Sequence, residues 1–166
     1  LGAHINEAAI RLLTRHGVEV VVPQDEACCG VLVQHLGQEE RALAAARHNV
    51  DVWMRENEAD GLDAIVITTS GCGTTIKDYG HMLRMDAAYA NKAARVAGLA
   101  KDVSEYLDEL GILPAVRETG QRVAYHSACS LQHGQKLRDQ PRRLLRSLGF
   151  LVQDVPEGHI CCGSAG

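Results

Sequence analysis

The stretch EGHICCGSAG at residues 157–166 repeats, in chemistry and in setting, the earlier stretch DEACCG at residues 25–30. Each Cys-Cys-Gly motif follows a helix-like segment that ends at a glycine, Gly17 or Gly149, and then an apolar run. The glycine precedes the first cysteine of the motif by 11 residues in one copy and by 12 in the other. Such self-similarity indicates a duplicated supersecondary unit, so we expect two sites of one kind.

The composition is that of a folded globular chain, with 166 residues of which 46% are hydrophobic and 23% are charged. The net charge of −4 provides no general basic face, so nucleic acid is not an expected partner. No apolar run reaches the roughly 20 residues that a membrane span needs, and the start does not resemble a signal peptide. We therefore expect a cytoplasmic chain, at most peripheral on the cytoplasmic membrane, and we interpret it as a fragment because it starts at Leu1 and stops directly after the second motif.

Apolar periodicity predicts strands that alternate with helices. We expect helices at 3–16, 37–57, 74–88, 91–110 and 138–148, and strands at 18–22, 63–69, 122–126 and 150–155. This alternation predicts an α/β fold with a layered, mainly parallel sheet and right-handed crossovers. Each cysteine-bearing loop follows a predicted strand, and such loops gather at the carboxyl edge of a parallel sheet. We assign the first cysteine-rich repeat to residues 1–110 and the second to residues 121–166.

The six cysteines divide into two sets of three. The first set is Cys28, Cys29 and Cys72, and the second is Cys129, Cys161 and Cys162. In the first set the pair is followed 43 residues later by a single cysteine, and in the second a single cysteine is followed 32 residues later by the pair. A complete repeat unit could consist of a single cysteine, an adjacent pair and a further single cysteine. Such a unit would supply four thiols, and each copy here would lack one of the outer cysteines.

Four thiolates suit an iron–sulfur cluster and also a structural zinc ion. The adjacent pair favours a cluster, because several irons offer more widely separated attachment points than one tetrahedral ion. Gly30 and Gly163 give the backbone the freedom to turn both thiols toward one centre. Gly71 and Gly73 flank Cys72 at a strand-to-helix turn, where backbone N–H groups favour the thiolate and can donate to cluster sulfides. A zinc site, a thiol redox site and buried structural cysteines remain alternatives.

Other side chains give weaker signals. His126 and His159 adjoin the second cysteine set and are candidates for a hydrogen bond to cluster sulfur or a proton path, although a surface or helix-end position is their ordinary role. Tyr79 and Trp53 are expected to be packing residues. The basic residues Lys77, Lys136, Arg138, Arg142 and Arg143 are expected on solvated helix faces. Because no Gly-x-Gly-x-x-Gly loop is present, we expect no flavin or nicotinamide site on this segment.

Four segments together closely resemble a known family. They are TSGCG at 69–73, KDYGH at 77–81, YHSACSLQHGQ at 125–135 and HICCGSAG at 159–166. They are similar to the iron–sulfur subunit of glycolate oxidase (glycolate dehydrogenase), within the wider family that has duplicated cysteine-rich (CCG) domains. That family includes the cysteine-rich subunit of heterodisulfide reductase, the anaerobic glycerol-3-phosphate dehydrogenase small subunit and lactate-utilisation proteins. Its members are longer and carry an N-terminal ferredoxin-like part that is absent here.

The resemblance implies that the six cysteines are cluster ligands or redox thiols, with [4Fe–4S] the expected cluster. It also implies a partner subunit that carries FAD and oxidises glycolate to glyoxylate. This chain would pass the electrons toward the membrane quinone pool, as part of an oxidoreductase and without being catalytic alone.

The resemblance leaves alternatives open. One is a heterodisulfide reductase-like thiol/disulfide redox subunit, and another is the iron–sulfur subunit of a lactate or glycerol-3-phosphate dehydrogenase. Cys72 is followed by Gly-Thr-Thr instead of completing a Cys-x-x-Cys motif, so a fifth ligand is missing. This departure speaks against a disulfide-cleaving cluster of the heterodisulfide reductase type.

Overall fold

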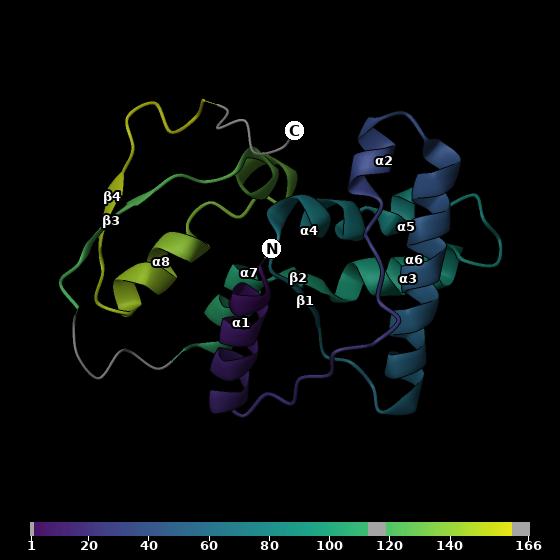
Figure 1. Ribbon diagram of the computed structural model, residues 1–166, viewed down its shortest axis with the longest axis horizontal. Coiled ribbons are helices and arrows are strands. Elements are labelled where there is room, and N and C mark those ends of the chain that lie inside the picture. The colour runs from purple at the N-terminus through teal and green to yellow at the C-terminus, as the bar shows by residue number, and fades with distance from the viewer. Residues whose placement is uncertain (1, 113–118, 161–166) are drawn as a thin grey trace.

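The computed structural model describes residues 2–112 and 119–160 (Figure 1). The first part contains α1 (Ala3–Arg15), α2 (Val31–His35), α3 (Glu39–Ala59), β1 (Ile65–Ile67), α4 (Ser70–Lys77), α5 (Tyr79–Met82), α6 (Ala90–Leu99), β2 (Ala100–Asp102) and α7 (Val103–Leu110). The second part contains β3 (Arg122–Tyr125), the π-helical turn η1 (Ser130–Gly134), α8 (Gln140–Ser147) and β4 (Leu151–Asp154).

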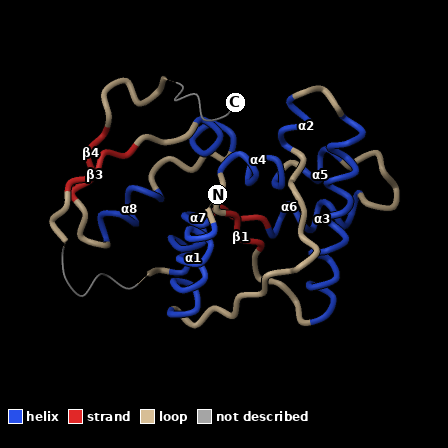
Figure 2. Tube along the Cα trace, in the orientation of Figure 1, coloured by secondary structure: helices blue, strands red, loops and turns tan. Residues whose placement is uncertain are grey.

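The described strands form two short parallel pairs. β1 pairs with β2, with Ile65 opposite Ala100, and β3 pairs with β4, with Arg122 opposite Leu151. Figure 2 shows the two pairs in separate places, one near the centre of the molecule and one at its side. The α/β class with parallel pairing is confirmed. The cysteine loops do not share the edge of one continuous sheet, however, because each part of the chain has its own pair of strands.

The larger apolar core lies against α3. Ala42, Ala46, Val50 and Trp53 follow one another at helical spacing along this helix and are all buried. Ala46, Val50 and Trp53 pack in a cluster that includes residues of β1, α4, α5, α6 and β2. This core positions the loop before α2 and the start of α4, which carry the first cysteine set.

Residues 18–22 do not form the predicted strand. Val21 and Val22 are 54% and 65% exposed, and no described strand pairs with this segment. The apolar run has the composition of a strand, but a strand also needs a hydrogen-bonding partner along its edge. The loop with the first cysteine pair therefore follows an extended, unpaired segment.

The predicted helix at 91–110 is interrupted by β2. Ala100 pairs with β1, and Asp102 then caps α7. The Asp102 carboxylate accepts a hydrogen bond from the Ser104 N–H at 2.9 Å, and the Glu105 carboxylate accepts one from the Asp102 N–H at 3.2 Å. This capping box starts a new helix within a run whose apolar spacing alone looks continuous. The predicted helix at 74–88 likewise divides, at Asp78, into α4 and α5.

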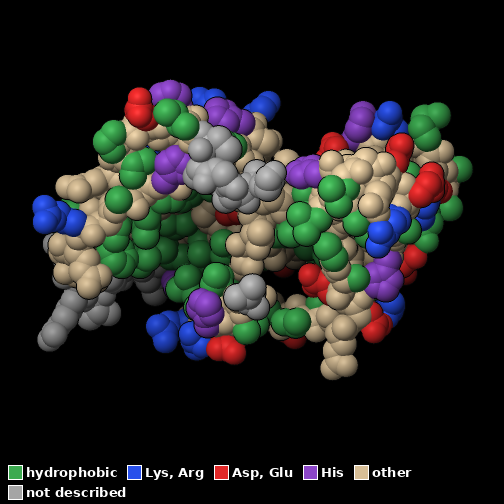
Figure 3. All heavy atoms as spheres, turned by 45° about the horizontal axis from the view of Figure 1, so that its top comes forward, with side chains coloured by type: hydrophobic (Ala, Val, Ile, Leu, Met, Phe, Trp, Pro, Cys, Tyr) green, Lys and Arg blue, Asp and Glu red, His purple; other side chains and the backbone are tan. Residues whose placement is uncertain are grey.

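Within the described residues, no helix is both long and apolar enough to span a bilayer. On the face drawn in Figure 3, Lys and Arg side chains are interspersed with Asp and Glu, so this face carries no continuous basic patch. Three of the basic residues expected on solvated helix faces form ion pairs within the chain. These are Lys77 with Glu105, Arg142 with Asp154, and Arg143 with Asp108.

Candidate metal centre

The first Cys-Cys-Gly motif forms a tight turn between the extended segment and α2. Cys28 is exposed, whereas Cys29 is only 5% exposed and belongs to the apolar core. Gly30 follows with a φ of 86° and serves as the N-cap of α2. A Cβ at Gly30 would lie 3.2 Å from the Ala42 carbonyl oxygen. Both the left-handed backbone and the close approach of α3 therefore require glycine at this position.

Two fully buried side chains hold the backbone of this turn. The Asn49 Oδ1 accepts a hydrogen bond from the Ala27 N–H at 2.9 Å. The Asn49 Nδ2 donates to the carbonyl oxygens of Ala27 at 3.2 Å and of Cys28 at 3.3 Å. The Tyr79 hydroxyl donates to the Cys29 carbonyl oxygen at 2.9 Å. The sequence predicts Tyr79 only as a packing residue and does not single out Asn49, whose signal is a lone amide within the apolar stripe of α3.

Cys72 lies in the first turn of α4, just beyond the carboxyl end of β1. A hydrogen-bonding interaction between the Cys29 and Cys72 thiols shifts the pKa of both groups. This interaction, together with burial, raises the pKa of the Cys29 thiol far above its ordinary value. The same interaction lowers the pKa of Cys72 to about 7, against the opposing effects of burial and of the nearby Cys28 charge. The structure thus brings the three thiols of the first set into one neighbourhood.

The preformed part of this site is the Cys29–Cys72 pair. Among the residues that the structure describes, no group of three or more His, Cys, Asp or Glu side chains is arranged to hold a metal ion. Cys28 acts on Cys72 through its charge but is exposed, as expected for adjacent cysteines whose side chains diverge. The donor set fits a thiolate-ligated metal centre in its chemistry, with the Cys29 and Cys72 thiols coupled to each other and the Cys28 side chain required to turn inward.

The coupling between the Cys29 and Cys72 thiols predicts a specific cross-link in metal-free protein. When diamide oxidises the reduced, iron-free chain, we expect a Cys29–Cys72 disulfide, because the interaction between these two thiols is the main cause of the pKa shift of each and Cys72 packs against the core cluster that contains Cys29. Two thiols lose two electrons and two protons to the azo group of diamide. Peptide mass spectrometry after digestion should detect the cross-link in the wild type and in Cys28→Ser, but not in Cys72→Ser. A dominant Cys28–Cys29 disulfide in the wild type would contradict this arrangement.

The second cysteine set is described only in part. Cys129 is half-buried and directly precedes η1, whereas Cys161, Cys162 and Gly163 lie outside the described residues. His126 is half-buried directly after β3, and His159 is exposed. Two residues before Cys129, the buried hydroxyl of Ser127 has no hydrogen-bond partner within the described chain. The role of the second set as ligands stays a prediction.

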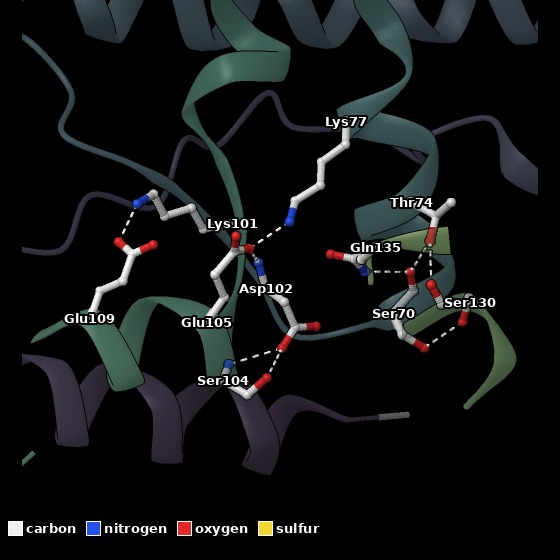
Figure 4. Close-up of polar contacts among 10 residues, drawn as sticks. All are labelled: Ser70, Thr74, Lys77, Lys101, Asp102, Ser104, Glu105, Glu109, Ser130 and Gln135. Carbon is white, nitrogen blue, oxygen red and sulfur yellow. Dashed lines mark hydrogen bonds and ion pairs between the residues drawn. The ribbon is translucent and has the colours of Figure 1, made fainter. Parts of the chain in front are cut away.

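Polar side chains join the segment around Cys72 to the segment around Cys129 (Figure 4). The Ser130 hydroxyl donates to the Ser70 hydroxyl at 2.9 Å, and the Thr74 hydroxyl donates to the Ser130 carbonyl oxygen at 3.1 Å. The Gln135 side-chain amide donates to the Ser70 carbonyl oxygen at 2.9 Å. The start of α4 and η1 therefore pack against each other, and the segments that contain Cys72 and Cys129 meet through flanking residues. The sequence does not predict this contact, since short hydroxyl side chains carry no periodic signal.

Comparison with known families decides which kind of unit is duplicated. The model of the cysteine-rich domain (CCG) family matches residues 2–77 and 123–166. This chain belongs to the cysteine-rich domain family. The two matched segments contain all six cysteines, three in each. This match confirms the duplication that the repeated Cys-Cys-Gly motifs predict.

Two curated relatives are named as iron–sulfur subunits of glycolate oxidase. The cysteine-rich domain chain is 43% identical over 166 residues to the glycolate oxidase iron–sulfur subunit of Escherichia coli K12, which is 100% of this chain and 40% of that protein. It is 33% identical over 164 residues to the probable glycolate oxidase iron–sulfur subunit of Bacillus subtilis, which is 97% of this chain and 36% of that protein.

A third relative is shorter. The lactate utilization protein A of Bacillus licheniformis is 26% identical over 166 residues, which is 99% of this chain and 67% of that protein. The cysteine-rich domain chain thus spans about two fifths of the length of the first two relatives. No solved structure matches it.

Proposed function

We propose that this chain is the electron-transfer part of the iron–sulfur subunit of a glycolate oxidase complex. A partner subunit that carries FAD oxidises glycolate to glyoxylate, with the release of two electrons and two protons. This chain receives the electrons from the flavin and passes them toward the quinone pool on the cytoplasmic side of the membrane. The observation that carries the proposal is the 43% identity over the whole chain to the Escherichia coli glycolate oxidase iron–sulfur subunit.

The cysteines have distinct places in this proposal. Cys28, Cys29 and Cys72 hold one centre in the repeat at 1–110, and Cys129 with the second Cys-Cys pair holds another in the repeat at 121–166. A bound [4Fe–4S] cluster supplies one-electron transfer, which the protein alone does not provide. The packing of Cys72 against the core cluster that contains Cys29 supports the first centre, because it joins residues that are 43 positions apart in the sequence.

The chain's own backbone supports the sulfur ligands. Backbone N–H groups act to lower the pKa of both thiols, that of Val31 for Cys29 and that of Cys72 for its own thiol. Such N–H donors stabilise thiolates and tune the reduction potential of a bound cluster. Gly71 leaves the backbone beside Cys72 open, because a Cβ there would meet nothing within 4 Å, whereas Gly73 lies against the Gln135 side chain. We assign His126, His159 and the glycine of the second motif to the equivalent surroundings of the second centre.

A second candidate is the iron–sulfur subunit of a lactate-oxidising system. The match to the lactate utilization protein A of Bacillus licheniformis favours it, because the aligned region is two thirds of that protein. In this candidate the chain has the same electron-transfer role, and only the 2-hydroxy acid bound by the partner subunit differs.

Reduction by substrate separates the two candidates. The full-length subunit and its flavin partner are purified together without oxygen, mixed with glycolate, lactate or glycerol-3-phosphate, and examined by EPR. We expect glycolate to produce the signal of a reduced iron–sulfur cluster within the turnover time of the complex. A signal with lactate alone would favour the second candidate, and a colourless protein without iron would overturn both.

A further inference from the structure

Asn49 is a buried polar residue within the described apolar core, with 0% of its surface exposed. Its amide is fully buried on the face of α3 that otherwise carries Ala46, Val50 and Trp53. Burial of an amide without hydrogen bonds destabilises a protein, so a buried Asn marks a position where its bonds are required. Its hydrogen bonds within the described residues go to the Cys28–Cys29 turn and to the Tyr79 hydroxyl.

Asn49 and Tyr79 act on the turn as one unit. The Asn49 Nδ2 also donates to the Tyr79 hydroxyl at 3.4 Å, and this hydroxyl donates in turn to the Cys29 carbonyl oxygen. Between them the two side chains bind three consecutive carbonyl oxygens, those of residues 27, 28 and 29. Successive carbonyl groups of an extended strand point in opposite directions, so these bonds hold the backbone of the cysteine pair in a bent conformation.

The bent backbone determines where the Cys29 sulfur lies. With its carbonyl group held by Tyr79, Cys29 is followed by Gly30 in the left-handed conformation, which starts α2. Cys29 belongs to the apolar core cluster, and Cys72 from α4 packs against the same cluster. Two buried side chains from α3 and α5 therefore fix the position of a thiol by binding the backbone around it.

We infer that Asn49 and Tyr79 are positioning residues that hold the Cys28–Cys29 turn in the conformation in which Cys29 and Cys72 share one metal centre. The inference rests on the proposed function, because it assigns the residues a role toward that centre. The inferred role of Tyr79 is more than packing. For packing alone the ring would be sufficient, because it stacks on Trp53 with 6.3 Å between ring centroids.

The substitution Tyr79→Phe tests the inference because it keeps the ring and removes only the hydroxyl. The matched control is Tyr89→Phe, whose hydroxyl also donates to α3, but to the Asp51 carboxylate at 2.7 Å instead of to the cysteine turn. In the full-length subunit, we expect Tyr79→Phe to increase iron release to a chelator by roughly tenfold, as for other residues that orient metal ligands. The EPR signal of the dithionite-reduced first centre should also change, whereas Tyr89→Phe should leave both readouts unchanged.

A second measurement does not need the metal. In reduced, iron-free protein, Cys29 should react slowly with iodoacetamide because it is 5% exposed, and Tyr79→Phe should accelerate its alkylation several-fold relative to Tyr89→Phe. Equal Cys29 alkylation and equal iron release in the two variants would overturn the inference. Substrate-dependent EPR signals report on the proposed function separately, so faster Cys29 alkylation with no glycolate response would retain the positioning role and reject glycolate oxidation.

Discussion

Cys72→Ser in the full-length subunit is expected to lose the iron and the acid-labile sulfide of one centre completely. Serine keeps the size of the side chain but replaces the thiolate, which is the ligand that iron–sulfur clusters require. Cys72 comes from α4 and packs against the core cluster that contains Cys29, and the remaining adjacent pair alone cannot surround a cluster. Iron and sulfide analysis with EPR on anaerobically purified protein provides the measurement.

The matched control for Cys72→Ser is Thr75→Ser on the same helix. Thr75 is 6% exposed and its hydroxyl donates to the Gly71 carbonyl oxygen, a bond that serine can also form. This control should retain the full iron content and a similar unfolding temperature. If Cys72→Ser kept the iron content of the wild type, Cys72 would not be a ligand, and the first centre as proposed would be wrong.

Gly134→Ala is expected to separate the two cysteine segments and destabilise the protein by about 1–3 kcal/mol, the usual effect of overpacking. A Cβ at Gly134 would lie 2.9 Å from the Thr74 Cγ2 and 3.0 Å from the Thr74 Oγ1. Thr74 is β-branched and its hydroxyl is hydrogen-bonded to Ser70 and Ser130, so it cannot easily move aside. The free energy of unfolding in urea measures the effect.

A double-mutant cycle shows whether this contact is the cause. Thr74→Ser removes the Cγ2 and keeps the hydroxyl, so Gly134→Ala should be less destabilising in that background. The control is Gly98→Ala in α6, where a Cβ meets nothing within 4 Å and helix propensity should raise stability by about 0.5–1 kcal/mol. Additive effects of Thr74→Ser and Gly134→Ala would mean that η1 does not pack on α4 as described.

The parts of the fold that the sequence predicted are those with a repeating local signal. α1, α3 and α8 follow apolar periodicity, and β3 and β4 follow short apolar runs beside glycines. The incorrect predictions concern segments whose structure depends on strands that are distant in the sequence. Residues 18–22 have strand composition but no neighbouring strand among the described residues, and β2 forms within a helix-like run because β1 lies beside it.

The candidate site also has a part that the sequence predicted and a part that it did not. The pairing of Cys72 with the first Cys-Cys motif could be predicted from the repeat, because duplicated units place equivalent cysteines in equivalent loops. The role of Asn49 could not be predicted, because a single amide within an apolar helix face does not indicate which backbone groups it binds. The contact between Ser70 and Ser130 could not either, because it joins residues 60 apart through hydroxyl groups that are common on any surface.

The position of the metal tests the central claim most directly. Diffraction data from crystals of the anaerobically purified full-length subunit, collected on both sides of the iron absorption edge, locate every iron atom. The account predicts an iron anomalous peak bound by the sulfurs of Cys28, Cys29 and Cys72. An anomalous peak at the zinc edge in that position, or a Cys29–Cys72 disulfide with no metal beside it, would contradict it.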